Sequence, residues 1–198
     1  MIDWNVVVTV RHDFDRAVAL MRKLGAVERT GLYNVLVMYV PDVRELLEKI
    51  ARLPPEAQFF ATISHVVPVT YKLTFETAEE FESKARDIVL AWAPELAGSS
   101  LHVRMRRRGH KGELHGLELE QRLGTALLDE LEQRGTPGRF VVDDPDNVIA
   151  IETIRDEAGL ALWTRADLER YPFLRASIER GAARHAPLAS GVSEMPRT

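Results

Sequence analysis

The sequence contains no cysteine. This absence excludes disulfide bonds, a thiolate nucleophile, and zinc or iron–sulfur centres held by cysteine. An excess of basic residues is also missing, because 26 Lys and Arg stand against 30 Asp and Glu, giving a formal net charge of −4. Proteins that bind nucleic acid through their overall charge are usually basic. Any contact of this chain with a polyanion therefore has to come from a local cluster of cations.

Long apolar segments are absent as well. No run approaches the roughly 20 apolar residues of a membrane-spanning helix. The start, Met1-Ile2-Asp3-Trp4, lacks the basic and apolar regions of a secretory signal, and we expect a cytoplasmic protein. What is present is a hydrophobic content of 45% over 198 residues, which suits one medium domain or two small ones.

The first 68 residues predict a small α/β unit with alternating strands and helices. The strands are expected at Asn5–Val10, Ala26–Thr30, Tyr33–Val40 and Phe59–Val67. Asp13 is the expected N-cap of a first helix, and Pro41-Asp42 opens a second. The order β-α-β-β-α-β is that of a ferredoxin-like unit, which we assign to residues 1–68.

Residues 69–175 predict a second α/β unit. Its expected strands after the first helix are Leu101–Arg107, Phe140–Val142, Val148–Thr153 and Gly159–Thr164. A long helix is expected over Leu117–Gln133, with a core face formed by Leu117, Gly124, Leu127, Leu128 and Leu131. Residues 176–198 are rich in Ala, Arg, Ser, Gly and Pro and predict a flexible tail.

One segment, Arg104–Lys111, is strongly basic and contains no acid. Strand alternation places Arg104 and Arg106 on one face, and the remaining cations fall in a loop before the long helix. Arginine and lysine in such a place suit the phosphates of a polyanion. Charge alone also fits a solvated strand edge or pairing with nearby glutamates, so it leaves both interpretations open.

Three segments in this order resemble the THUMP family of RNA-binding domains. They are His102–Lys111 followed by Leu117–Gly124, the acidic turn and strand Val142–Glu152, and the closing strand Gly159–Leu162. The likeness covers roughly residues 70–175, and the preceding ferredoxin-like unit is the usual companion of such domains. The closest likeness is to stand-alone THUMP proteins of the tRNA cytidine-acetylation adaptor type.

This resemblance implies a protein that grips the acceptor stem and 3′ CCA end of tRNA. A modification enzyme such as an acetyltransferase would then act on the bound tRNA. The residues that would contact RNA by position are Arg104, Arg106, Arg107, Arg108, His110, Lys111 and Arg122. The catalytic motifs of THUMP-bearing thiouridine synthetases and methyltransferases are missing, as are Gly-rich nucleotide loops. We therefore expect no catalytic residue, no cofactor and no metal, and a homodimer is compatible with an open sheet edge.

Other candidate sites have weaker support. His102, His110 and His115 lie near each other in sequence, but their spacing matches no metal-ligand motif. The turn Asp143–Asp146 is compatible with Mg²⁺ but more typical of a structural turn. The acids Glu152, Asp156 and Glu157 are expected at the surface, although the resemblance also allows Glu152 to pair with an arginine.

Of the tryptophans, Trp92 is expected in the core, and Trp163 is the candidate for stacking on an RNA base.

Two rival functions remain open on the sequence alone. The first is a protein-interaction module that keeps the fold but no longer binds RNA, and the second is a small RNA- or nucleotide-modifying enzyme. The surroundings of the basic segment separate the adaptor from the interaction module. Exposed arginines without acidic partners favour RNA, whereas neutralisation by Glu113, Glu118 or Glu152 favours the module.

Overall fold

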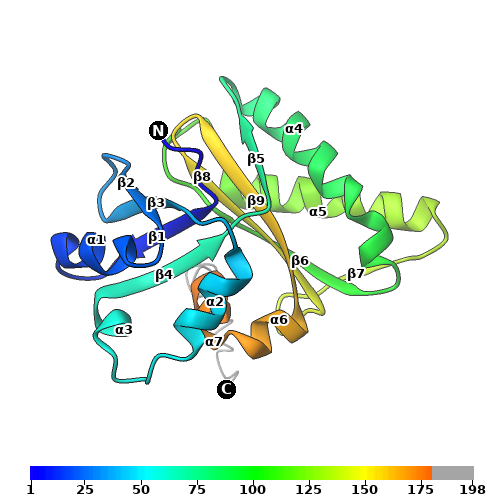
Figure 1. Cartoon of the computed structure of the whole chain (residues 1–198). Helices are drawn as coiled ribbons and strands as arrows, with labels where there is room; N and C mark the ends of the chain where they lie inside the picture. The colour runs from blue at the N-terminus through cyan, green and yellow to red at the C-terminus, as the bar shows by residue number, and fades with distance from the viewer. Residues whose placement is uncertain (180–198) are drawn as a thin grey trace, which may run out of the picture.

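The computed structural model describes the backbone of residues 1–179 and the side chains of residues 1–176. The fold is α/β and contains two β-sheets with helices packed on them (Figure 1). The expectation of an α/β fold is confirmed.

The first sheet has the order β2-β3-β1-β4, and every pairing in it is antiparallel. Its strands are β1 (Val6–Val10), β2 (Ala26–Arg29), β3 (Val35–Tyr39) and β4 (Ile63–Pro68). Its helices are α1 (Phe14–Arg22), α2 (Val43–Ala51) and α3 (Gln58–Thr62). This strand order is that of a ferredoxin-like unit, as the turn and capping signals predict.

Local sequence explains where these helices begin. The carboxylate of Asp13 accepts the N–H of Arg16 at 3.1 Å, and that of Asp42 accepts the N–H of Glu45 at 3.0 Å. The strand expected over Phe59–Val67 is wrong in its first half, because residues 58–62 form the short helix α3. A helix of little more than one turn is too short to show an apolar period, so its aromatic residues imitate a strand.

The second sheet is mixed and has the order β5-β9-β8-β6-β7. Its strands are β5 (Tyr71–Thr74), β6 (Ser100–Arg106), β7 (Arg139–Phe140), β8 (Asn147–Ile154) and β9 (Glu157–Thr164). The strands β6, β7 and β8 run parallel, while β9 pairs antiparallel with β5 and β8.

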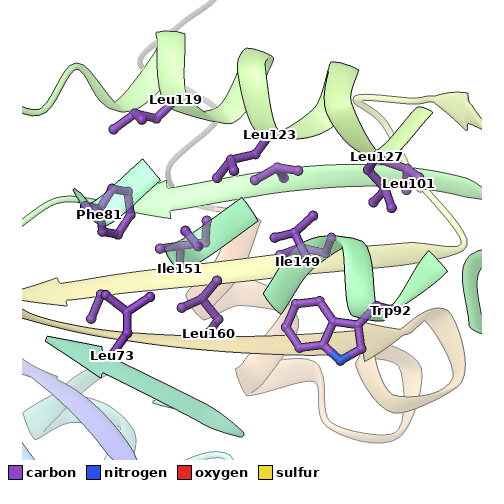
Figure 2. Packing of buried hydrophobic residues seen from close by; sticks show 14 of the residues in the cluster. Leu73, Phe81, Trp92, Leu101, Leu119, Leu123, Leu127, Ile149, Ile151 and Leu160 are labelled. Carbon is purple, nitrogen blue, oxygen red and sulfur yellow. The ribbon is translucent and has the colours of Figure 1, made fainter. Parts of the chain in front are cut away.

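Helices α4 (Ala78–Ala91) and α5 (Gly116–Gln133) cover one face of this sheet, with the 3-10 turn η1 (Ala93–Leu96) after α4 (Figure 2). The buried face of α5 contains Leu119 and Leu123 in addition to the expected Gly124, Leu127 and Leu131. The placement of Leu117 in the core is wrong, since it is 49% exposed at the first turn of α5.

The opposite face of the second sheet packs against α6 (Arg165–Arg170) and α7 (Pro172–Glu179). Tyr171 and Leu174 are buried there with Leu47 of α2 and Val67 of β4, so these helices also contact the first unit. Helix α7 includes residues 176–179, the start of the predicted flexible tail. The rest of that tail lies outside the described residues.

Candidate nucleic-acid interface

The basic segment begins on β6 and continues into a loop, as its alternation predicts. Leu101 and Val103 are fully buried beneath the helices, while Arg104 and Arg106 are half-buried. The strand ends at Arg106, and residues 107–115 form the loop that leads to α5. The expected order of strand, basic loop and helix is therefore confirmed.

Two of the arginines form a buried ion-pair network with Glu152. In the parallel register of β6 and β8, Arg106 lies opposite Glu152, whose residue surface is only 3% exposed. The Glu152 carboxylate forms an ion pair with Arg108 and lies 3.9 Å from Nη1 of Arg106. Arg108 also donates a hydrogen bond to Oγ1 of Thr9 on β1, at 2.9 Å. Arg108 thus links β1 and β8, and its charge is compensated inside the protein.

Glu152 is consequently not a surface acid, which corrects that expectation. The alternative, that Glu152 pairs with an arginine, is confirmed. A carboxylate with so little contact with water needs charged partners, because an isolated buried charge is strongly disfavoured.

His110 lies between two carboxylates. Its Nδ1 is 2.7 Å from Glu113, its Nε2 is 2.8 Å from Asp156, and its ring lies 5.1 Å from the ring of Phe75. The hydrogen bond to Glu113 raises the pKa of His110 above its ordinary value; burial opposes this and Asp156 reinforces it. His110 therefore fastens the basic loop to the β8–β9 turn and is engaged with acids.

Arg122 does not join the basic loop. Its guanidinium lies 2.9 Å from Glu82 on α4 and 3.7 Å from Glu118 on α5. The side chain is about half exposed, so these contacts contribute little to stability, but they occupy the guanidinium with acids.

Arg107 and Lys111 are different, because no acid among the described residues pairs with them. Arg107 donates a hydrogen bond to the carbonyl of Gly109 at 2.9 Å, and Lys111 is exposed. Arg107 and Lys111 therefore carry charge that no ion pair within the described part of the protein compensates.

One further cation close to this loop was not among the candidates. Arg155 lies in the β8–β9 turn, and its backbone N–H donates to the carbonyl of Arg108 at 3.0 Å. It forms no ion pair with the described residues. The sequence shows only a turn at Arg155, because its proximity to the basic loop depends on the pairing of β8 with β6.

A shallow hollow lies between β6 and the start of α5. It is lined by His102, Arg104, Leu117, Glu120, Gln121, Phe140 and Val142. His102 is buried and donates through Nδ1 to the carbonyl of Val141 at 3.1 Å. Burial, followed by the charge of Arg104, lowers the pKa of His102 to about 4. His102 is thus neutral near pH 7 and adds no charge to the basic segment.

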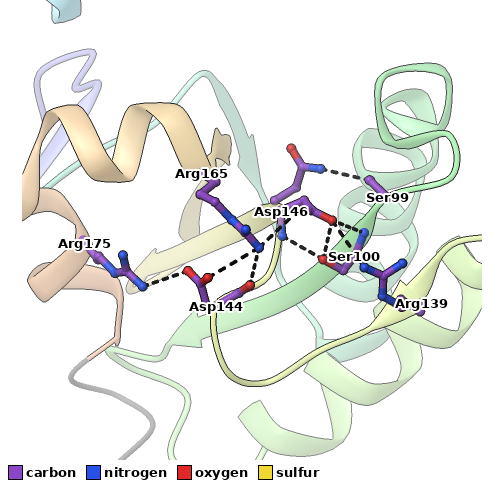
Figure 3. A network of polar contacts seen from close by, with 8 residues as sticks. Ser99, Ser100, Arg139, Asp144, Asp146, Arg165 and Arg175 are labelled. Carbon is purple, nitrogen blue, oxygen red and sulfur yellow. Dashed lines mark hydrogen bonds and ion pairs between the residues drawn. The ribbon is translucent and has the colours of Figure 1, made fainter.

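The acidic turn is held by arginines (Figure 3). Asp146 accepts hydrogen bonds from the N–H and hydroxyl of Ser100 and lies 3.1 Å from Arg165. Asp144 lies 3.0 Å from Arg175 and 3.6 Å from Arg165. These contacts agree with the interpretation of the segment as a structural turn.

The tryptophans lie in the core. Trp92 is buried as expected, but Trp163 is only 5% exposed and packs with Tyr171 and Leu168. The expectation that Trp163 is available for base stacking is therefore wrong. Within the described residues, no group of three potential ligands for a metal ion occurs. None of the described helices combines the length and apolar character that a bilayer crossing requires.

Comparison with known proteins shows similarity at the level of fold. No family model and no curated protein matches the sequence. The solved structure of PH1313 from Pyrococcus horikoshii Ot3 matches 80% of this chain with a TM-score of 0.57 and 13% identity. A 4-thiouridine synthetase, solved as an RNA complex with bound ATP, matches 82% of the chain with a TM-score of 0.51 and 13% identity.

This chain spans 53% of the length of PH1313 and 42% of the length of the synthetase. The likeness agrees with the THUMP-like α/β fold that the sequence resemblance implies.

Proposed function

We propose that this chain is a THUMP-type RNA-binding adaptor. It binds the acceptor stem and 3′ CCA end of tRNA and presents the tRNA to a modification enzyme, such as a cytidine acetyltransferase. The observation that carries the proposal is the pair Arg107 and Lys111, cations of one loop that no described acid neutralises. The similar fold of a synthetase solved with RNA supports the same conclusion.

The location of these cations suits a phosphate backbone. They follow the end of β6, and Gly112 next to Lys111 has a positive φ of 94° and nothing within 4 Å of where a Cβ would lie. A ligand backbone can therefore approach the loop closely. Because the chain as a whole carries a net charge of −4, the attraction is confined to this local region.

The test is tRNA binding across a salt series. Changing Arg107→Ala and Lys111→Ala together should weaken binding and make the plot of log affinity against log salt shallower. The slope should fall by roughly 0.7 to 0.9 for each phosphate that the variant no longer neutralises. The matched control is Arg52→Ala with Arg86→Ala, which removes the same charge from exposed positions at the end of α2 and on α4. An equal weakening in both double variants would contradict the site.

The 3′-end assignment and the adaptor role have their own measurements. Intact tRNA should bind more tightly than tRNA lacking its CCA end; equal affinity would contradict recognition of that end. In the adaptor proposal, the purified chain alone leaves every nucleoside of the tRNA unmodified. Turnover by the chain alone would support the rival function of a small enzyme.

The interaction module without RNA binding is the second candidate, and a specific observation favours it. Glu152 pairs with Arg108 and lies near Arg106, Glu113 contacts His110, and Glu118 lies near Arg122. These acids compensate much of the basic segment. If the unmodified chain fails to bind any tRNA at low salt, the interaction module is the better description.

A further inference from the structure

Three loops, one from the first sheet and two from the second, meet around Arg155. They are the β2–β3 turn (residues 30–34), the basic loop after β6 (residues 107–115) and the β8–β9 turn (residues 155–156), which lie at the end of the molecule near the N-terminus (Figure 1). A Cβ added at Gly31 would lie 2.7 Å from Nη2 of Arg155, and one at Gly109 would lie 3.1 Å from its Cα. Arg155 is thus in contact with both neighbouring loops.

The residues of these loops that lack an ionic partner among the described residues include three cations. Arg107, Lys111 and Arg155 form no ion pair with the described residues. Arg155 also lines a hollow that contains four acids. Asp156 contacts His110, Glu157 contacts Trp4 and Lys72, Glu80 contacts Lys84, and Glu76 is exposed. Three cations from two loops of the second unit therefore lie beside a loop of the first unit.

That loop of the first unit presents an aromatic ring to solvent. Tyr33 is 90% exposed, the most exposed of the large hydrophobic residues whose side chains the structure describes. It lies between Gly31 (φ 75°) and Asn34 (φ 57°), whose left-handed backbone shapes a tight turn. Tyr33 is two residues from Gly31, in the turn that approaches the guanidinium of Arg155, and its ring is in solvent.

Exposed aromatic rings beside cations are what unpaired nucleotides require. A base stacks on the ring while arginine and lysine contact the flanking phosphates. A double-stranded stem offers phosphates but keeps its bases stacked inside the helix. The combination of Tyr33 with Arg107, Lys111 and Arg155 is therefore selective for RNA that has an unpaired nucleotide next to a charged backbone.

We propose that the three loops form one RNA-binding surface, on which Tyr33 stacks against an unpaired base and Arg155 contacts an adjacent phosphate. This inference rests on the proposed RNA-binding function and extends it to the first unit. It assigns roles to two residues outside the basic segment.

The experiment compares two RNA hairpins of identical stem, one blunt and one with a short unpaired 3′ extension. The full chain should bind the extended hairpin more tightly. Tyr33→Ala should lose about tenfold in affinity for the extended hairpin, the scale of one stacked base, and little for the blunt one. Tyr33→Phe keeps the ring and should bind like the unchanged chain. Because Tyr33 is exposed, both variants should keep the unchanged chain's melting temperature.

Arg155→Ala tests the second role. It should weaken binding of both hairpins and reduce the salt dependence by roughly 0.7 to 0.9 in log–log slope. If Tyr33→Ala binds both hairpins like the unchanged chain, or Arg155→Ala leaves the slope unchanged, the inference is overturned while the proposed function stands. If the unchanged chain binds neither hairpin nor tRNA but binds an acidic peptide, the surface is a protein interface and both proposals fail.

Discussion

Glu152 lies on β8 with 3% of its surface exposed, and it decides which arginines of the basic segment are available to a ligand. Arg106 and Arg108 turn toward this carboxylate, whereas Arg107 does not. Neighbouring residues of the same type thus have opposite roles. Arg108 contributes to the fold, and Arg107 keeps a charge that no described acid pairs with.

Replacing Arg108 with Ala tests this division at the residue scale. The change leaves Glu152 buried with only the more distant Arg106, and removing one partner of a buried pair costs about 3 to 5 kcal/mol. We expect a loss of that size in the unfolding free energy, measured by urea denaturation. Arg107→Ala is the matched control and should change stability by less than about 0.5 kcal/mol.

A double variant separates the charge effect from the loss of side-chain packing. Arg108→Ala with Glu152→Ala removes both charges and should be less destabilised than Arg108→Ala alone. A double variant as unstable as the sum of both single changes would show that the pair does not act as a unit.

Two glycines in the basic loop adopt backbone angles that other residues rarely adopt. Gly109 combines a φ of 104° with a close approach to the backbone of Arg155, so a side chain there is strained and also crowds the neighbouring turn. Gly112 has a φ of 94°, but nothing lies within 4 Å of an added Cβ. A side chain would thus be strained at both glycines, but only at Gly109 would it also press on the β8–β9 turn.

Gly109→Ala should lower the unfolding free energy by about 1 to 3 kcal/mol through backbone strain. In addition, displacement of the β8–β9 turn should speed the hydrogen exchange of the Arg155 amide, which donates to the carbonyl of Arg108. Gly112→Ala carries comparable strain but should leave that exchange rate close to its original value. Equal protection of the Arg155 amide in both variants would contradict the proposed contact.

At this scale, the sequence predicts elements better than it predicts the pairing between them. Turn and cap residues such as Asp13, Gly31 and Asp42 place the elements of the first unit, because each acts within a few residues. The basic loop is also correctly located by local pattern. Local pattern does not identify the partners of its arginines, and the pairing with Glu152 is expected only from the resemblance. The β6–β8 register that sets Arg106 opposite Glu152 depends on packing far along the chain.

The whole molecule is held together by the helices that follow β9. Tyr171 donates a hydrogen bond to Glu48 of α2 at 2.7 Å, and Arg44 of α2 pairs with Asp167 of α6. The same helices bury Trp163 against the second sheet. Helices α6 and α7 thus contact both sheets.

Leu174→Ala tests this coupling. Leu174 is fully buried, and its truncation should cost about 2 to 5 kcal/mol. Since its cluster includes residues of both units, urea unfolding should remain a single transition when followed by far-UV circular dichroism and by tryptophan fluorescence. Leu117→Ala makes the same chemical change at a 49% exposed position and should cost much less. Two separate transitions in Leu174→Ala would show that the units unfold independently.

The strand order of the second sheet also has a consequence for synthesis on the ribosome. All strands of the first sheet are present once β4 has emerged. Strand β5, however, cannot pair until β9 is made, because its Tyr71 lies opposite Leu160 of β9. Long-range pairing of this kind is slow and leaves apolar strands uncovered while translation proceeds. The nascent chain therefore has all strands of its first sheet, but an unfinished second sheet, until nearly all of its sheet residues are made. During this interval the uncovered apolar strands are targets for a chaperone that binds apolar segments.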